Sequence, residues 1–582
     1  MKITSGEYIA KFLKNEKIEV VFGIIDGTYQ GLVAGLKKEG IRLITPRHET
    51  SAAHMAGAYA RVTGKLGVCI ASNGPGVANI LPGVTVENAE GNRVLLITSS
   101  RRAGIGYPDR GGTYQYFDQV GVISNISKYS VTTPHANRIP ELMKKAMRKS
   151  FIGRPGIVHL DLPENLMNSK SEFPELMSPE TYRLNYRLSA SKKQINEAAK
   201  VLMSAKKPII HAGSGVIHSL AFEELKELAE LLKIPVVTSW AARGVLTEDS
   251  NLAIPMIHID VNNKARKEAD AVLVLGSRLG ETDWWGKAPY WNTPDRQKIV
   301  QVDIDEDVIG NIRPVDVPVL SDIKSFLQDL IKEVSKSNNK IDYSSRELFI
   351  NDLQKATISD RAKLDKKLSD KKSPMITAHV PNIANQVFSK DSLVVFDGGN
   401  SAVWGNFFHK ITTPNTILST FKFGMLGAGL GQALGAAAAF PNRQVYCIIG
   451  DGAMGFHPQE IETAIRNDLK PIFFVICDKQ WGMVKMTQQF AMKPIKTMIK
   501  KELSSSETIN TDLGEIEFDK LAESMGAHGE RVSSPDELEP AINRCVQANK
   551  CAVIHVDVDH VKHMWAPGLM NFKAMHQEPK GK

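Results

Sequence analysis

The chain has 582 residues, of which 42% are hydrophobic and 23% are charged, and its formal net charge at pH 7 is +8. A chain of this length exceeds a single hydrophobic core, so we expect several domains, and the ordinary composition excludes disorder as the dominant state. Lysines and arginines are scattered among acidic residues rather than gathered in one stripe, which argues against nucleic-acid binding.

The first residues predict an amphipathic helix without the apolar segment of a secretory signal peptide. No run of about 18 apolar residues occurs, and the small-residue stretch 428–440 is too short to span a bilayer. The five cysteines form no CxxC pair, which favours reduced thiols over a disulfide framework. We therefore expect a soluble, cytoplasmic protein with no membrane partner.

Apolar runs of strand length alternate with segments of helical period along nearly the whole chain. Glycine, proline or polar turns bound these runs, as is typical of buried parallel strands joined by crossover helices. The pattern predicts an α/β fold class throughout. The clearest strand candidates are 68–71, 94–97, 208–211, 271–275, 445–449 and 472–476.

Two polar stretches, 168–193 and 332–372, interrupt this pattern. They predict three domains, at 1–167, 194–331 and 373–582. The first and third domains each contain a strand, a glycine-containing turn, a helix and another strand, which indicates a loose internal similarity. A further polar stretch, 493–515, predicts a surface helix, with a mobile lid as the alternative.

In the first domain, Glu49 begins an alanine-rich helical segment that follows the extended segment 41–46. Taken alone, an acidic residue at a helix N-terminus is explained by the helix dipole. The glycine-rich turn Ser72-Asn-Gly74-Pro-Gly follows the next predicted strand.

In the third domain, a predicted buried strand delivers Gly450-Asp451-Gly452 at its carboxyl end, where open α/β sheets bind ligands. The glycines allow close approach of a ligand to the backbone, and Asp451 offers a hard oxygen to Mg²⁺. Asp478 directly follows the next predicted strand. Because the two strands are expected to be parallel, both carboxylates should meet at one sheet edge, where they could hold a metal that bridges a diphosphate.

The other glycine-containing candidate segments match no known phosphate-binding motif. The segment 57–66 lacks the Walker spacing and ends in Leu66 rather than Ser or Thr, and neither 213–218 nor 427–435 gives GxGxxG in register. A dinucleotide dehydrogenase is therefore the weaker enzyme class.

The segment 450–482 resembles the diphosphate-binding motif of thiamine-diphosphate enzymes, in which Gly-Asp-Gly is followed, after a helix and a strand, by Asn-Asn. Cys477-Asp478 stands where that family usually has Asn-Asn. The resemblance implies thiamine diphosphate and Mg²⁺ as cofactors, with Asp451, Asp478 and the backbone carbonyl of Gln480 as metal ligands. It also implies that Leu426 supports the thiazolium ring from below. Further cofactor contacts are implied at Gly74, Asn400, Gly424, Gly450, Gly452, Ala453, Gly482 and Met483.

The segment Arg47-His-Glu49, followed by Gly74-Pro-Gly, is similar to the pyrimidine-domain pattern of the same family. The resemblance implies that Glu49 activates the aminopyrimidine ring of the cofactor, and a carboxyl with that role should be buried so that its pKa rises toward neutrality. Gln115 matches a substrate-side glutamine, with an ordinary loop amide as the alternative. Asp26 could donate a proton, or could simply be a turn residue before Gly27.

The likeness extends over nearly the whole chain and is closest to the acetolactate-synthase, benzoylformate-decarboxylase and oxalyl-CoA-decarboxylase group. It implies three doubly wound parallel-sheet domains, namely pyrimidine-binding, central Rossmann-like and diphosphate-binding, in a homodimer or homotetramer with active sites at the subunit interface. FAD or ADP in the central domain is left open. Four aromatic residues there could stack on an acyl-CoA or nucleotide ring or could pack in the core: Trp284, Trp285, Tyr290 and Trp291.

The substrate is less constrained. Thr282 and Thr487 stand where acetolactate synthases carry Arg and Trp. Our hypothesis is a carboligase or decarboxylase acting on a 2-oxoacid, acetolactate-synthase-like, with a benzoylformate-type decarboxylase or a 2-hydroxyacyl-CoA lyase or oxalyl-CoA-decarboxylase-type enzyme acting on an acyl-CoA-type substrate as alternatives. A catalytically inactive cofactor-binding oligomer is the alternative from a different class, and the presence of Glu49 argues against it.

Overall fold

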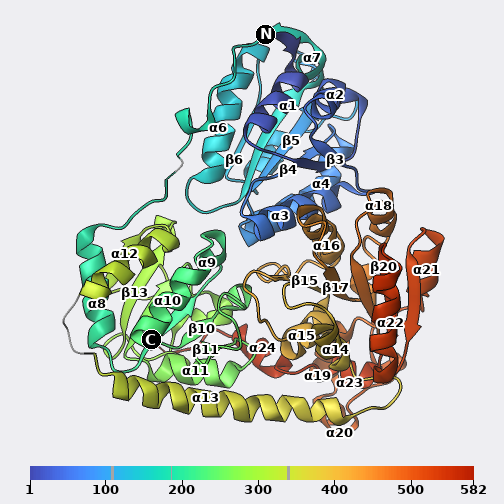
Figure 1. The fold of residues 1–582 in the computed structure, drawn as a ribbon. Coiled ribbons are helices and arrows are strands. Elements are labelled where there is room, and N and C mark those ends of the chain that lie inside the picture. The colour runs from blue at the N-terminus through green and yellow to red at the C-terminus, as the bar shows by residue number, and fades with distance from the viewer. Residues whose placement is uncertain (107–109, 185, 337–340, 582) are drawn as a thin grey trace.

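The computed structural model describes residues 1–106, 110–184, 186–336 and 341–581, and within them three sheets of six parallel strands succeed one another along the chain (Figure 1). Apolar clusters lie on both faces of each sheet and are covered by helices. The predicted α/β class with three doubly wound sheets is confirmed, while the exact domain limits stay predictions. Among the described residues, no helix combines the length and the apolar character needed to cross a membrane.

The sheet of the first domain has the strand order β3-β2-β4-β5-β7-β6. Its strands are β2 (Val20–Gly23), β3 (Arg42–Ile44), β4 (Gly67–Ala71), β5 (Val94–Ser100), β6 (Tyr129–Thr132) and β7 (Ile157–Pro163). Its helices are α1 (Ser5–Asn15), α2 (Gln30–Lys38), α3 (Glu49–Thr63), α4 (Pro75–Glu90), α5 (Gln119–Ser124), α6 (Ile139–Phe151) and α7 (Glu164–Asn168). A small antiparallel ribbon pairs β1 (Lys2–Thr4) with β8 (Lys170–Glu172).

The sheet of the third domain has the strand order β16-β15-β17-β18-β20-β19. Its strands are β15 (Leu393–Asp397), β16 (Ile417–Leu418), β17 (Val445–Gly450), β18 (Ile472–Cys477), β19 (His528–Val532) and β20 (Ala552–Asp557). Its helices are α14 (His379–Val387), α15 (Gly399–Phe408), α16 (Ala428–Ala439), α17 (Asp451–Met454), α18 (Glu460–Arg466), α19 (Gly482–Met492), α20 (Pro494–Lys500), α21 (Phe518–Ser524), α22 (Pro535–Gln547), α23 (His560–Met564) and α24 (Leu569–Met575). Counted along the chain, both the first and the third sheet have the order 2-1-3-4-6-5, so the similarity predicted between these domains is a shared topology.

The central sheet has the order β11-β10-β9-β12-β13-β14, which corresponds to the Rossmann order 3-2-1-4-5-6. Its strands are β9 (Pro208–Ala212), β10 (Val236–Thr238), β11 (Ala253–Ile254), β12 (Ala271–Leu275), β13 (Lys298–Asp303) and β14 (Val317–Leu320). Its helices are α8 (Lys192–Ser204), α9 (Gly215–His218), α10 (Phe222–Leu232), α11 (Ile259–Glu268) and α12 (Ile323–Lys336).

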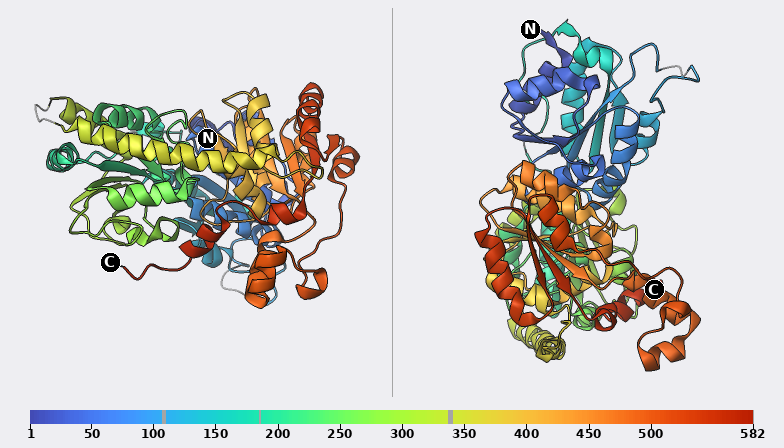
Figure 2. Two further views of the ribbon diagram at one scale, coloured as in Figure 1. Left: turned by 90° about the horizontal axis from the view of Figure 1, so that it is seen from below. Right: turned by 90° about the vertical axis from the view of Figure 1, so that its right-hand side faces the viewer.

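A long helix, α13 (Tyr343–Asp365), runs along the outer edge of the central and third domains (Figures 1 and 2). The carboxylate of Asp360 lies 2.8 Å from the ring of His258 in the central domain, and Arg361 donates to the carbonyl of Phe407 in the third. Much of the polar stretch that separates these domains in the sequence therefore forms helix α13. The buried residues of this helix are confined to its first three turns.

The first and third domains meet where α3 packs against α16. A Cβ atom at Gly435 would lie 2.2 Å from the carbonyl oxygen of Met55, and one at Gly431 would lie 2.7 Å from the Cβ of His54. The small-residue stretch noted in the sequence is thus a surface for close helix packing, and it places the N-terminal part of α3 beside the third domain.

Candidate active site

Three neighbouring strands of the third domain end at the same edge of the sheet. Asp397 of β15 pairs with Ile449 of β17, and Gly450 pairs with Ile476 of β18. The chain leaves these strands through three turns that begin α15, α17 and α19. Most of the predicted cofactor-binding residues stand on these turns: Asn400, Gly450, Asp451, Gly452, Ala453, Asp478, Gln480, Gly482 and Met483.

The buried side chains of Asn400 and Asp478 at this edge carry polar atoms that have no hydrogen-bond partner among the described residues. Asn400 is 5% exposed, and neither its amide oxygen nor its amide nitrogen is paired. Oδ2 of Asp478, which is 8% exposed, also accepts no hydrogen bond and lies 3.9 Å from Nε2 of His563. Both side chains converge on Gly482, where a Cβ atom would lie 2.6 Å from Nδ2 of Asn400 and 3.2 Å from Oδ2 of Asp478. Unpaired buried polar atoms are costly, so this arrangement fits a polar ligand.

Asp451 and Asp478 face each other across the ends of β17 and β18. Oδ1 of Asp451 accepts a hydrogen bond from the backbone N–H of Gly452, and Oδ2 accepts one from the N–H of Lys479, both at 2.7 Å. Burial raises the pKa of Asp451, and burial together with the nearby charge of Asp451 holds the pKa of Asp478 well above its usual range. A divalent cation between the two carboxylates would stabilise their ionised forms.

The other third-domain candidates line or support the same edge. Gly450 lies against Ser401, and the thioether of Met483 lies 3.0 Å from where a Cβ of Gly399 would be. Ala453 is buried in α17. Leu426 is partly buried against the core between the domains, and Gly424 lies in the exposed loop before α16 with a left-handed φ of 71°.

Gln480 is buried, and its side chain is fully engaged. Its Nε2 donates to the carbonyl of His560, and its Oε1 accepts from Nζ of Lys485, both at 3.0 Å. The predicted role of Gln480 as a metal ligand therefore depends on its backbone carbonyl.

In the first domain, Glu49, Gly74 and Gln115 lie together around α4. Oε2 of Glu49 accepts from Nδ2 of Asn79 at 3.1 Å, and its Oε1 lies 3.6 Å from where a Cβ of Gly76 would be. The carbonyl of Gln115 approaches Gly74, which has a left-handed φ of 65° and no room for a side chain. The side chain of Gln115 is exposed, and that of Glu49 is partly exposed in this single chain, whereas a buried carboxyl was expected.

Asp26 serves as a helix cap. Its Oδ1 accepts from the backbone N–H of Thr28 at 2.8 Å and from the Thr28 hydroxyl at 2.7 Å. Burial raises the pKa of Tyr29, and the charges of Asp26 and Glu49 raise it further, so these two carboxylates flank the same ring. The turn role considered for Asp26 is present, and its proton-donor role stays a prediction.

Arg47 and His48 join this first-domain group to the third domain. Their backbone N–H groups donate to the buried carboxylate of Glu460, at 3.0–3.2 Å, and Arg47 also pairs with Glu462. The ring of His48 lies 5.0 Å from that of His457, between centroids. Glu460 was not singled out in the sequence, because its backbone partners lie more than 400 residues away along the chain.

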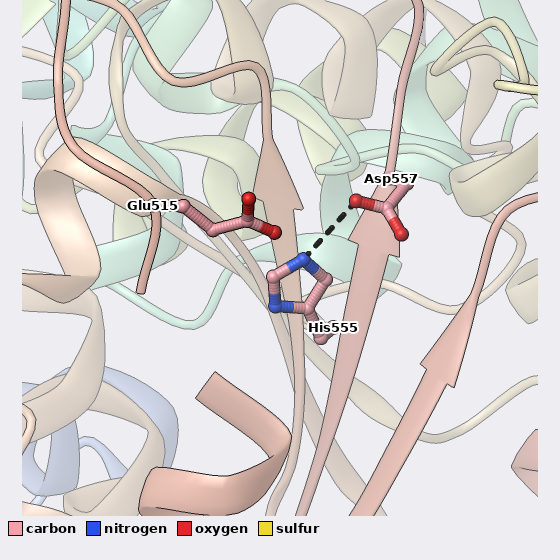
Figure 3. Close-up of side chains that lie close together, drawn as sticks. All are labelled: Glu515, His555 and Asp557. Carbon is pink, nitrogen blue, oxygen red and sulfur yellow. Dashed lines mark hydrogen bonds and ion pairs between the residues drawn. The ribbon is translucent and has the colours of Figure 1, made fainter. Parts of the chain in front are cut away.

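A second set of metal-ligand residue types lies nearby, formed by Glu515, His555 and Asp557 (Figure 3). Arg531 bonds both oxygens of Asp557, at 2.8 and 3.0 Å, and one oxygen of Glu515, at 2.7 Å. Lys479 pairs with the other oxygen of Glu515 at 2.8 Å. Two protein cations already compensate these carboxylates, so we assign the group a structural role.

A cavity of about 960 Å³ opens at the carboxyl edge of the central sheet. It lies between β9 and β12, which is the switch point where Rossmann sheets bind nucleotides. Glycine turns at 213–215 and after β12 form its floor. Cationic residues from all three domains line it, namely Arg93, Arg154, Arg183, Arg187, Arg278 and Lys422, together with the acidic residues Glu281, Asp283, Asp303 and Asp322.

Of the aromatic residues considered for stacking, only Trp285 lines this cavity. Trp284 is buried and stacks on Tyr290 at 3.6 Å between ring centroids, and Trp291 is buried in the same cluster. These three residues therefore pack in the core, which was the alternative to stacking on a ligand ring.

Comparison with known proteins covers almost the whole chain. Models of three thiamine pyrophosphate enzyme domains match: the N-terminal TPP binding domain at residues 3–122, the central domain at 195–330 and the C-terminal TPP binding domain at 397–556. A probable acetolactate synthase large subunit of Methanococcus aeolicus is 30% identical, over 96% of this chain and 92% of the relative. Another from Methanocaldococcus jannaschii is 28% identical over 95% and 92%, and an acetolactate synthase of Mycobacterium bovis is 28% identical over 95% and 87%.

Proposed function

The chain belongs to the thiamine pyrophosphate enzyme family, and from this premise we propose that it is a carboligase of the acetolactate-synthase type, acting on 2-oxoacids with thiamine diphosphate and Mg²⁺. The observation that carries the proposal is the convergence of unpaired Asn400 and Asp478 on Gly482, beside Asp451, in the domain whose family relatives bind the cofactor.

Asp451, Asp478 and the carbonyl of Gln480 would hold Mg²⁺, and Asn400 with the adjoining backbone would receive the diphosphate. Hard oxygen donors suit Mg²⁺, and the raised pKa of both carboxyl groups is the state that a cation would relieve. When bound, thiamine diphosphate supplies a carbon nucleophile and an electron sink.

Glu49 would exchange a proton with the aminopyrimidine ring and hold it in the active tautomer. Because its carboxylate is only partly covered in one chain, we propose that a second copy completes its surroundings in a homodimer or homotetramer. Light scattering on the purified protein tests this assembly. The five cysteines, all buried and unpaired, support a cytoplasmic location.

The central cavity would bind a nucleotide, either FAD or ADP. Its place at the Rossmann switch point, its cationic lining and the indole of Trp285 suit a polyanion that carries a flat ring. Mass spectrometry of small molecules released from the denatured protein would distinguish FAD, ADP and an acyl-CoA.

A panel of 2-oxoacids, supplied with thiamine diphosphate and Mg²⁺, tests the function through the ratio of substrate consumed to CO₂ released. Carboligation consumes two 2-oxoacids for each CO₂, because the acyl unit left by one adds to the carbonyl of the other, whereas simple decarboxylation consumes one. We expect the first ratio, with product identified by mass spectrometry. Release of an equimolar aldehyde would instead assign a decarboxylase, and turnover of an acyl-CoA without any of a 2-oxoacid would assign the lyase alternative.

A further inference from the structure

Lys485 lies beneath the turn that carries two of the proposed metal ligands. It stands in the first turn of α19, and its side chain is 4% exposed. Its ammonium donates to Oε1 of Gln480 and Oδ1 of Asp512, both at 3.0 Å, and to Oε1 of Glu502 at 3.3 Å. Three oxygen partners match the three donors of a lysine ammonium, so this group is fully committed to its surroundings.

The turn above it, residues 478–481, has an unfavourable backbone conformation that its neighbours must maintain. Lys479 has a left-handed φ of 57°, which a non-glycine residue seldom adopts. Its N–H donates to Asp451, and its carbonyl accepts from the N–H of Leu513 at 2.8 Å. The N–H of Trp481 donates to the carbonyl of Thr511 at 2.7 Å. The turn is thus held between β17 and the segment 502–515, which we name the strap.

Among the described residues, Lys485 alone joins the side chain of Gln480 to two of the four acidic residues of the strap, Glu502 and Asp512. Glu502 and Asp512 are partly exposed, with side-chain exposures of 28% and 39%. The ammonium of Lys485 is more deeply buried than either carboxylate. Without it, the amide oxygen of Gln480 would lose its partner, and the carboxylates of Glu502 and Asp512 would lose their shared lysine cation.

We propose that Lys485 is a positioning residue for the metal and diphosphate site: by tying Gln480 to the strap, it fixes the turn that presents Asp478 and the Gln480 carbonyl. This inference rests on the proposed function. Outer partners of metal ligands orient those ligands, and their loss weakens metal affinity by about 10–100-fold.

The test compares Mn²⁺ binding, measured by electron paramagnetic resonance with thiamine diphosphate present, in the wild-type protein and in Lys485→Met. Methionine keeps an unbranched side chain that is one atom shorter, and it removes the charge. We expect the dissociation constant for Mn²⁺ to rise about tenfold or more. Lys493→Met is the matched control, because Lys493 also binds the strap, through Glu507, but does not contact Gln480, and its affinity should equal that of the wild type.

A triple variant, Lys485→Met with Glu502→Gln and Asp512→Asn, separates positioning from stability. Neutralising the two acids should restore the melting temperature of the apo protein but leave Mn²⁺ binding weak. Wild-type affinity in Lys485→Met, or recovery of affinity together with stability in the triple variant, would overturn the inference. Failure of the wild-type protein itself to bind Mn²⁺ with thiamine diphosphate would instead refute the proposed function.

Discussion

At Gly482 the site has no room for a side chain. The backbone of this residue is not in the left-handed region, so the need for glycine is steric rather than conformational. A Cβ atom would meet the amide of Asn400 and Oδ2 of Asp478, both of which lack a hydrogen-bond partner among the described residues. The glycine therefore preserves the space in which a diphosphate and its metal would meet these groups.

We predict that Gly482→Ala weakens binding of thiamine diphosphate, measured by quenching of tryptophan fluorescence in the presence of Mg²⁺, by about tenfold or more. The free energy of unfolding of the apo protein should change by less than about 1 kcal/mol, because alanine is the better helix former at this position. Gly514→Ala is the control, since a Cβ there meets nothing within 4 Å. Equal affinity in both variants would show that Gly482 does not border the cofactor.

Asp451 and Asp478 could be predicted as neighbours because each directly follows a strand, and adjacent parallel strands end together. Lys485 and Glu460 could not, because their partners are distant in sequence: Asp512 for the first, and the backbone of Arg47 and His48 for the second. No local pattern encodes such pairings. The partial exposure of Glu49 likewise could not be predicted from the sequence of the helix that it begins.

The packing of α3 against α16 joins the first and third domains through glycine contacts. Gly431 and Gly435 allow the two helix backbones to approach closely, and the alanines around them fill the remaining space. Since Glu49 begins α3 and Leu426 precedes α16, this contact also sets how the two groups of candidate residues lie relative to each other.

We predict that Gly435→Ala destabilises the protein by about 1–3 kcal/mol, because the added methyl group would lie 2.2 Å from the carbonyl oxygen of Met55 and force the helices apart. Helix propensity alone predicts the opposite, a gain of up to about 1 kcal/mol. Urea unfolding followed by circular dichroism measures the difference. Ala438→Gly, in the same helix, reports the propensity term together with the loss of one partly buried methyl group, and stabilisation by Gly435→Ala would contradict the packing account.

The strands could be predicted from the sequence because burial on both faces makes them continuous apolar runs; β18, for example, is buried at every position. Helix α13 could not, because its fully buried residues are confined to the first three turns, and beyond them only scattered residues such as Ala356 and Leu364 pack against the core. Its polar surface resembles a linker in sequence, although His258 and Phe407 fix it to two domains.

At the scale of the whole molecule, two sheets of the same topology flank a Rossmann sheet along the chain. In the proposed assembly, the first domain of one chain and the third domain of its partner would divide one cofactor between them, the carboxylate of Glu49 serving the ring and the carboxylates of Asp451 and Asp478 serving the diphosphate. The architecture follows from apolar patterning and could be anticipated. In the proposed assembly, a second copy of the chain would complete the Glu49 site, which the family resemblance predicts and apolar patterning does not.

The most direct measurement is the rate of hydrogen–deuterium exchange at the reactive thiazolium carbon of bound thiamine diphosphate, followed by acid quenching and proton NMR. Glu49→Gln should slow this exchange by about two orders of magnitude or more relative to the wild type, with the dissociation constants for thiamine diphosphate and Mg²⁺ nearly unchanged. An equal exchange rate in the two proteins, with the cofactor fully bound to both, would contradict the assignment of Glu49 as the activating acid.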